Sequence, residues 1–163
     1  MAKTYVPIAT QTLGSAAASV TFSSIPATYT DLVLVIDAIG TGTGGGKLNF
    51  NSDSSALYSR TILHGNGTAA GSTRDTASTT CFISHLASVT SANRTNFVVH
   101  IMNYANTTTY KTSITRANNP AEATETTVGL YRSTNAISSI VIALSANSYD
   151  TGSTFSLYGI LAA

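Results

Sequence analysis

The chain has 163 residues, of which only 9% are charged, with a formal net charge of +1 and one cysteine. This length fits a single domain over residues 1–163, large enough to bury a core without disulfides or a metal. The dispersed Lys and Arg residues create no basic field, which argues against nucleic acid as a partner, while near-zero net charge favours association between copies.

The first residues lack the continuous apolar core of a signal peptide. The longest apolar run, Leu32 to Ile36, is too short to cross a bilayer as a helix. We therefore expect neither a membrane segment nor export through a signal peptide.

Short stretches rich in Val, Ile, Thr, Phe and Tyr recur at spacings of about 8 to 12 residues, as is typical of an all-β sandwich or barrel. Alternation of apolar and small polar residues predicts half-buried strands around Val20, Ile142 and Leu157. Further strands are expected, in chain order, at 3–10, 31–39, 57–64, 79–86, 96–104, 108–116 and 126–132.

Two of these stretches, 31–39 and 96–104, are continuously apolar, as expected of strands that are covered on both faces, and we place them centrally. No helix is expected that is long enough for a parallel crossover. The sequence therefore predicts an antiparallel two-sheet β-sandwich, and a jelly roll fits the number of strands best. An immunoglobulin-type sandwich is disfavoured because the chain has no Trp and one Cys, and a triple β-helix is a third option.

Segments rich in Gly, Asn and Ser predict loops at 40–46, 51–55, 65–78, 103–109 and 116–123. The longest is 65–78, whose Ala, Gly, Ser and Thr side chains cannot form a core. We expect this segment to be either a mobile tip or ordered only against a neighbouring chain.

The loop at 40–46 contains the spacing GxGxxG, which in a dinucleotide-binding fold presents a helix N-terminus to phosphate. No helical pattern follows it, so a flexible hairpin tip explains these glycines better. Alternating oxygen-bearing residues just beyond resemble a calcium loop only faintly, because only one of them is charged and no downstream Glu completes the set. These residues are Asn49, Asn51, Asp53 and Ser55.

The other candidates for chemistry do not form a set. Cys81 and His85 are about 13 Å apart along one expected strand, too far for a nucleophile and its base, and we interpret Cys81 as a small buried apolar residue. His64, His85 and His100 lie on three expected strands, and the carboxylates are scattered. We therefore expect no catalytic, cofactor-binding or metal-binding residues, no small-molecule substrate and no enzymatic activity.

Five tyrosines near expected strand or loop edges leave two interpretations open. Tyrosine combines a rigid ring with a polar tip and is enriched at interfaces. These rings form either a subunit interface or sugar-stacking platform, or they simply fill the rim of the sandwich. They are Tyr58, Tyr104, Tyr110, Tyr131 and Tyr149.

Three segments carry a resemblance that covers nearly the whole chain. They are YVPIATQTLGSAAASVTFSSIPATYTDLVLVI at the start, FNSDSSALYSRTILHGNGT in the middle and STFSLYGI at the end. Their motifs, Ser24-Ile25-Pro26, Gly65-Asn66-Gly67 and Leu157-Tyr158-Gly159-Ile160, resemble those of structural proteins of tailed bacteriophages, notably of cyanophages.

This resemblance implies a virion role rather than a reaction. Related domains often sit in longer fibre polypeptides, and because this chain has no stalk we expect a capsid decoration or cement protein that stabilises the head shell. The expected partners are the major capsid protein and further copies of the chain, as a trimer, on the capsid surface after synthesis in the host cytoplasm. The alternative is a tail or fibre-tip module that binds a receptor or carbohydrate.

Overall fold

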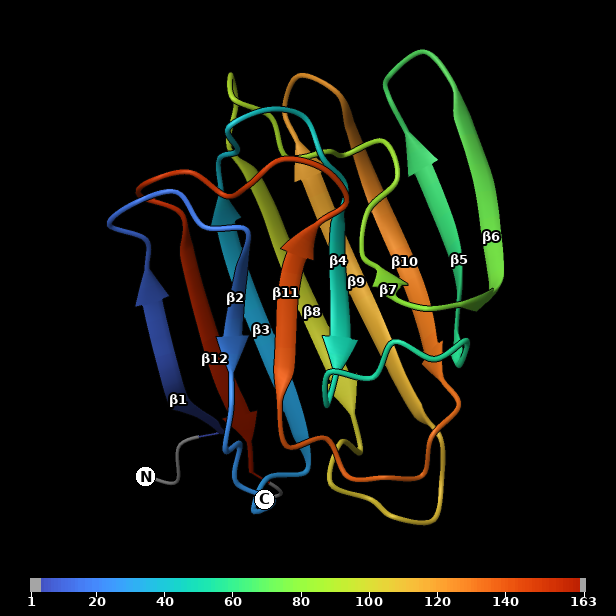
Figure 1. Ribbon diagram of the computed structural model, residues 1–163. Helices are drawn as coiled ribbons and strands as arrows, with labels where there is room; N and C mark the ends of the chain where they lie inside the picture. The colour runs from blue at the N-terminus through green and yellow to red at the C-terminus, as the bar shows by residue number, and fades with distance from the viewer. Residues whose placement is uncertain (1–3, 162–163) are drawn as a thin grey trace.

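The structure, a computed structural model that describes residues 4–161, is a sandwich of two antiparallel sheets (Figure 1). The larger sheet has the strand order β1-β12-β3-β8-β9-β10-β5-β6, and the smaller sheet has the order β2-β11-β4-β7. The predicted all-β sandwich is thereby confirmed. The strands in this part of the chain are β1 Tyr5–Thr12, β2 Ser19–Phe22, β3 Asp31–Ala38, β4 Gly46–Phe50, β5 Tyr58–Gly65, β6 Ala70–Ser78, β7 Cys81–Phe82, β8 Thr95–Met102, β9 Lys111–Asn119, β10 Ala123–Tyr131, β11 Ile140–Leu144 and β12 Thr154–Ile160.

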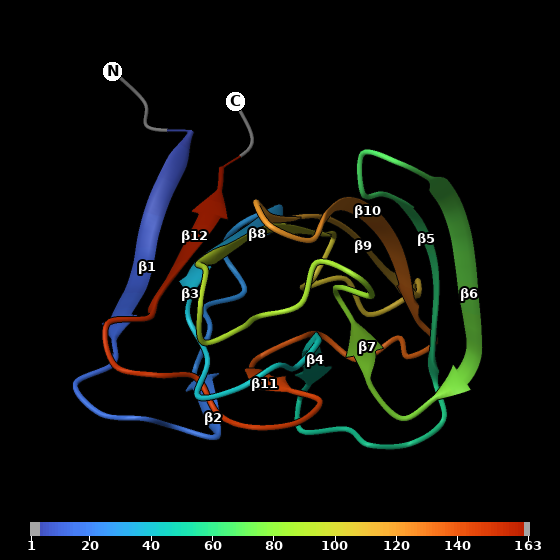
Figure 2. The ribbon, with the colours of Figure 1, turned by 90° about the horizontal axis from the view of Figure 1, so that it is seen from above.

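Eight of the strands are divided equally between the two sheets, and two hairpins are added to the larger one. β1, β3, β8 and β12 lie in the larger sheet, whereas β2, β4, β7 and β11 form the smaller sheet. The hairpins β9–β10 and β5–β6 extend the larger sheet beyond β8, and Figure 2 shows this extension curving past β7. The first strand lies beside the last, which is compatible with a jelly roll. The jelly-roll topology itself stays a prediction.

The core lies between β3 and β8 of the larger sheet and β4 and β11 of the smaller sheet. Successive side chains of a strand point to opposite faces, so alternate residues of β3 and β8 point inward. Burial of each such side chain contributes about 1.5–3 kcal/mol. The fully buried residues from these four strands include Leu32, Leu34, Ile36, Leu48, Phe97, Val99, Ile101, Ile140 and Ile142.

No helix within residues 4–161 is long and apolar enough to cross a membrane.

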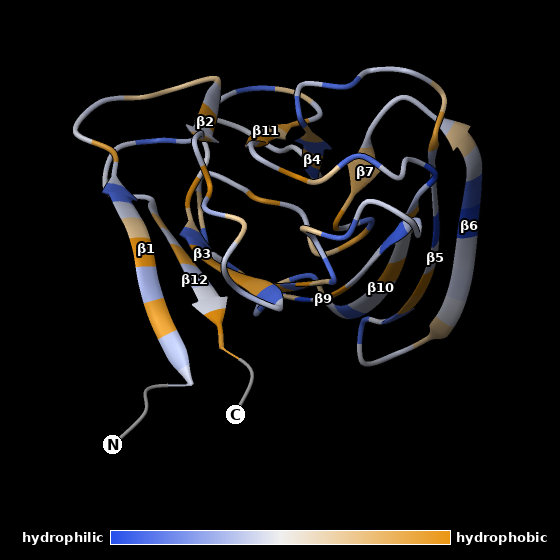
Figure 3. Ribbon diagram, turned by 90° about the horizontal axis from the view of Figure 1, so that it is seen from below, coloured by the Kyte–Doolittle hydropathy of each residue, from blue (hydrophilic) through white to orange (hydrophobic). Residues whose placement is uncertain are grey.

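The segment 65–78, expected to be a loop, is mostly the edge strand β6. Its turn is capped by the Asn66 side chain and passes through Gly67, whose φ of 87° favours glycine. Strand pairing uses backbone groups, so a stretch without large apolar side chains can still pair with β5, and Figure 3 shows β6 pale to blue along most of its length. The ion pair between Arg60 Nε and Asp75 Oδ2, 2.6 Å apart, also ties the two strands together. The expectation of a mobile tip, or of order only against a neighbouring chain, is wrong.

Other boundaries also differ from expectation. The strand expected at 79–86 is reduced to the two residues of β7, and the loop expected at 116–123 is shortened to residues 120–122. β9 and β10 have polar residues such as Thr115 and Thr127 on their inward side. The limits of these two strands therefore cannot be located from an apolar alternation.

The glycine-rich segment 40–46 is not a flexible hairpin tip, because β3 and β4 belong to different sheets and the segment crosses between them. A Cβ atom on Gly44 would lie 2.3 Å from the carbonyl oxygen of Ala146 in the β11–β12 loop. On its other side, Gly44 exchanges two backbone hydrogen bonds with Val89, each 2.9 Å long. The glycine therefore permits close packing of backbones.

We predict that Gly44→Ala lowers the free energy of unfolding by about 1–3 kcal/mol, because the new methyl group displaces the backbone at Ala146. Gly14→Ala is the matched control, since nothing lies within 4 Å of a Cβ atom at Gly14. Denaturant unfolding of both variants measures the difference. Equal losses at the two positions would contradict the packing role.

Two motifs of the phage resemblance meet where β2 joins β3. The ring of Tyr29 lies on Gly159, where a Cβ atom would be 2.2 Å from the Tyr29 Cγ atom. The buried hydroxyl of Tyr104 donates to the carbonyl of Pro26 and accepts a hydrogen bond from the backbone N–H of Tyr29 at 3.4 Å. The Ser-Ile-Pro and Leu-Tyr-Gly-Ile motifs thus close one end of the sandwich.

Candidate interaction surface

The outer side of the larger sheet, which faces away from the smaller sheet, carries a group of apolar side chains interspersed with polar ones such as Arg116 and Thr126. Outward side chains lie opposite one another across the strand pairs, with Val35 opposite Val98 and Ile114 opposite Val128. Such pairs have Cβ atoms about 4.5–5.5 Å apart. We call this surface the outer patch, and it consists of Val33, Val35, Leu63, Val98, Ile114 and Val128.

Four side chains of the outer patch are strongly exposed. The exposed fractions are 61% for Leu63, 52% for Val128, 42% for Ile114 and 38% for Val35. The continuous apolar runs of β3 and β8 predicted strands covered on both faces, and this holds only in part, because on the outer face Val33 is 7% exposed but Val35 is 38% exposed. A contiguous exposed apolar surface marks an interaction site on a soluble protein.

The hairpin β9–β10 departs from the usual polarity at several positions. Ile114 and Val128 point outward, whereas Thr115 and Thr127 point inward and are 1% exposed. A strand with one face on its own core normally places apolar residues inward and polar residues outward. The reversed pattern is a second indication that the outer patch is a contact surface.

Charged groups lie around and within the outer patch: carboxylates are on one side, Arg74 is on the other, and Arg116 lies between Val98 and Thr126. At the two ends of β3, Asp31 Oδ2 lies 2.9 Å from His100 Nε2, and Asp37 Oδ2 accepts a hydrogen bond from Arg94 at 3.0 Å. Across the sheet on β6, Arg74 is exposed and has no carboxylate within salt-bridge distance among residues 4–161. The outer side is therefore electrically asymmetric.

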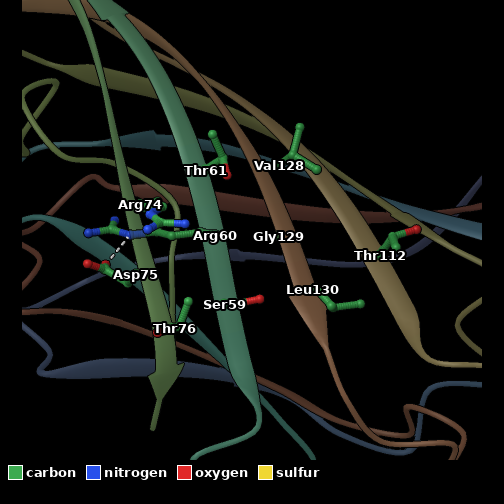
Figure 4. A pocket seen from close by; sticks show the side chains of 10 residues that line it. All are labelled: Ser59, Arg60, Thr61, Arg74, Asp75, Thr76, Thr112, Val128, Gly129 and Leu130. Atoms are coloured by element: carbon green, nitrogen blue, oxygen red, sulfur yellow. Dashed lines mark hydrogen bonds and ion pairs between the residues drawn. The ribbon is translucent and has the colours of Figure 1, made fainter.

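Two shallow depressions open on this side. One, of about 330 Å³, lies between β8 and β9 and is lined in part by Val98, His100 and Ile114. The other, also about 330 Å³, lies over β10, β5 and β6, where Figure 4 shows Thr61 and Val128 on neighbouring strands. The residues that line them include neither a pair of free carboxylates nor a nucleophile beside a base.

The residues of the faint calcium pattern hold the β4–β5 loop instead of converging on one point. Asn49 donates from Nδ2 to the backbone carbonyl of Asp53 at 2.7 Å, and Asn51 accepts from two backbone N–H groups of the β10–β11 loop. The Asp53 carboxylate accepts hydrogen bonds from Ser55 and from the Tyr131 hydroxyl, the latter at 2.7 Å. These bonds, chiefly the one from the Ser55 side chain, hold the pKa of Asp53 below its usual value.

Cys81 and His85 do not form a nucleophile–base pair. Cys81 is buried, and burial raises the pKa of its thiol to about 11. His85 packs against His64, with ring centroids 5.4 Å apart, whereas His100 lies on the outer side beside Asp31. Across residues 4–161, no three His, Cys, Asp or Glu side chains gather into a metal-binding group.

One carboxylate that the sequence did not single out organises the loop after β7. Glu125 points inward from β10, is 2% exposed and accepts hydrogen bonds from three successive backbone N–H groups. These belong to His85 at 2.7 Å, Leu86, and Ala87 at 2.8 Å. The carboxylate thus replaces apolar packing on the inner side of the β9–β10 hairpin.

We predict that Glu125→Gln lowers the free energy of unfolding by about 2–4 kcal/mol, because an amide offers one acceptor oxygen and no charge to three buried N–H groups. Glu122→Gln is the control, since the partly exposed Glu122 accepts only the N–H of Ser88 at 3.1 Å. Denaturant unfolding should show that Glu122→Gln lowers the free energy of unfolding by less than about 1 kcal/mol. Similar losses in both variants would argue against the role of Glu125.

Four of the five tyrosines with open interpretations fill the sandwich. Tyr58, Tyr104 and Tyr149 are fully buried and Tyr131 is 2% exposed, whereas Tyr110 is 55% exposed. The rings of Tyr58 and Tyr131 stack with centroids 4.7 Å apart. A sugar-stacking platform made from these rings is therefore wrong.

We predict that the protein loses stability in alkaline solution as its buried acids ionise. Burial raises the pKa of Tyr58 and Tyr149 above the ordinary 10.0, and that of Cys81 from 9.0 to about 11. Because each folded-state pKa exceeds the unfolded value, the stabilisation is complete below the unfolded pKa and is lost as the pH rises through the folded pKa.

Tyrosinate absorbance and circular dichroism recorded together across this range check the prediction. Tyr58 and Tyr149 should ionise only as the fold is lost. Ionisation of all the tyrosines in a protein that keeps its strand content would contradict the prediction.

The comparisons with known proteins are sparse. No protein-family model matches the sequence, and no curated protein matches it significantly. Among solved structures, the sucrose-6-phosphate hydrolase from Lactobacillus gasseri has a TM-score of 0.36 and 12% sequence identity. The similarity covers 89% of this chain but 28% of the hydrolase chain, and at this TM-score it assigns no function.

Proposed function

We propose that this protein is a non-enzymatic structural protein of a tailed-phage virion, namely a capsid decoration or cement protein that binds and stabilises the head shell. The outer patch carries this proposal, because it offers a broad apolar surface on a sheet while the candidate catalytic and metal-binding residues are used within the fold. The resemblance of three sequence segments to phage structural proteins supports the virion setting.

A decoration protein stabilises a shell because its docking removes apolar surface from water. Each Å² of apolar surface removed from water contributes about 25 cal/mol, so exposed Leu, Ile and Val side chains favour association. A net charge of +1 lets many copies lie side by side with little repulsion. The partners in this proposal are the major capsid protein and further copies of the chain, on the capsid surface.

The second candidate is a tail or fibre-tip module that binds a receptor. A groove of about 340 Å³ between the β5–β6 and β9–β10 turns favours it, because Asn66, Asn118 and Thr124 place amide and hydroxyl groups there. The burial of four tyrosines weighs against carbohydrate, since it removes the rings on which sugars would stack.

Purified virions of the phage that encodes this chain test the proposal. Quantitative mass spectrometry combined with cryo-EM should find on the order of hundreds of copies in register with the capsid lattice. A small number of copies confined to the tail or one vertex would support the receptor-binding alternative. Absence from the particle would overturn both candidates.

A further inference from the structure

We infer that His64 and His85 together bind a divalent transition-metal ion such as Zn²⁺, with water completing the coordination. The ion joins the loop after β7 to strand β5. This inference is independent of the virion role proposed above, because it concerns the inner side of the β5–β6 hairpin and not the outer patch.

The first observation is the placement of the two rings. His64 lies on β5 and His85 lies in the loop after β7, yet their ring centroids are 5.4 Å apart and the ring planes are tilted by 47°. A tetrahedral ion held by two imidazole nitrogens at about 2.0–2.1 Å places the ring centroids about 5 Å apart. The two rings are therefore at the separation that a shared ion requires.

The second observation is a ring nitrogen without a partner. Nδ1 of His64 is buried and makes no hydrogen bond. Buried polar atoms almost always have a partner, and one that lacks it calls for an ion or a water molecule. Imidazole nitrogens are the commonest metal ligands in proteins. His85 is exposed, so its ring is free to turn toward the same ion.

The third observation is a buried negative charge beside both histidines. Glu125 lies directly opposite His64 in the β10–β5 pair, and its Oε2 atom accepts the backbone N–H of His85 at 2.7 Å. Glu125 is 2% exposed, and among residues 4–161 no Lys, Arg or His nitrogen lies within salt-bridge distance of its carboxylate. Buried charges are normally paired with an opposite charge or held at a metal ion. An ion on the two histidines supplies that positive charge.

The charged groups around this cluster favour a cation as well. Arg60, nearer the start of β5, is paired with Asp75 at 2.6 Å and does not neutralise Glu125. A second carboxylate, that of Glu122, accepts the N–H of Ser88 in the same loop at 3.1 Å. The loop after β7 therefore lies between two carboxylates that have no cation of their own.

The ligands limit the choice of ion. Imidazole suits Zn²⁺, Cu²⁺ and Ni²⁺, whereas Mg²⁺ and Ca²⁺ require oxygen ligands. Within residues 4–161 no third His, Cys, Asp or Glu side chain completes a set of protein ligands. Water fills the remaining positions, and we expect weaker binding than at structural zinc sites, which have four protein ligands.

The bound ion strengthens a connection that polar contacts already make. The loop after β7 is held by Glu125 and by Arg60, which donates to the backbone carbonyl of Ser84 at 3.0 Å. An ion that binds the folded chain and not the unfolded chain stabilises the fold by mass action. The expected consequence is a metal-dependent stability of the β5–β6 extension.

Isothermal titration calorimetry of the chain without a histidine tag, with Zn²⁺ as the only ligand, tests the inference. One ion should bind each chain. A Zn²⁺ concentration about 100-fold above the dissociation constant should raise the midpoint of thermal unfolding by about 5–10 °C. Mg²⁺ at the same concentration should leave the midpoint unchanged.

Histidine variants locate the site. His85→Ala changes an exposed loop residue and should weaken Zn²⁺ binding at least tenfold while the protein stays folded. His64→Ala should do the same, and circular dichroism establishes whether it folds. His100→Ala is the matched control, because His100 lies on the outer side beside Asp31 and its loss should leave Zn²⁺ binding unchanged.

The absence of both heat and a thermal shift with Zn²⁺, Ni²⁺ and Cu²⁺ up to about 1 mM would overturn the inference. Undiminished binding by a folded His85→Ala variant would do so too, as would equal losses in His85→Ala and His100→Ala. An equal shift with Mg²⁺ would assign the effect to carboxylates alone and would also overturn it. The presence of the chain in virions is decided by a separate measurement, so either proposal can fail without the other.

Discussion

Packing of β3 and β8 onto β4 and β11 is the interaction on which the rest of the structure depends. The inward residues of these strands are almost completely buried, and their register positions β12 and β1 on one side and β9 on the other. The chain must then cross repeatedly between the sheets, and it does so through very close contacts, as where Gly44 meets Ala146 and Tyr29 lies on Gly159. Because the chain crosses so closely between the sheets, small residues such as Gly44 and Gly159 are needed at the ends of the sandwich.

Beyond this core, the β9–β10 and β5–β6 hairpins depend on polar contacts. Lys111 is 1% exposed and donates from Nζ to the backbone carbonyls of Thr109 at 2.8 Å and Thr134 at 3.2 Å. Arg60 lies over the ring of Phe82 at 4.6 Å from its centroid. Arg60 also donates to the backbone carbonyl of Ser84 at 3.0 Å, so these two side chains and Glu125 all bind loop backbone. The chain has few charged residues, and most of those that are buried hold backbone groups in place.

Apolar patterns in the sequence predicted most strands of the core, though not β4, and predicted the hairpin strands β5, β9 and β10 with shifted limits, but they missed β6. β3, β8, β11 and β12 lie close to their expected positions, because each buries an apolar face. β6 has no such face, and its pairing through backbone groups leaves no pattern of side chains. The role of Glu125 could not be predicted for a related reason. Its partners are backbone N–H groups, so no complementary charge in the sequence indicates it.

The outward residues of β9 and β10 are not explained by strand propensity. At neighbouring exposed positions the same two strands have Thr112, Thr124 and Thr126, and Thr forms strands well while remaining soluble. A chain with no partner on this side would gain only the cross-strand contact of Ile114 with Val128, and it would carry the cost of apolar surface in water. These two residues lie next to the continuous runs of β3 and β8, whose composition is that of strands covered on both faces. The outer side of the sheet thus carries apolar residues that one chain alone leaves exposed.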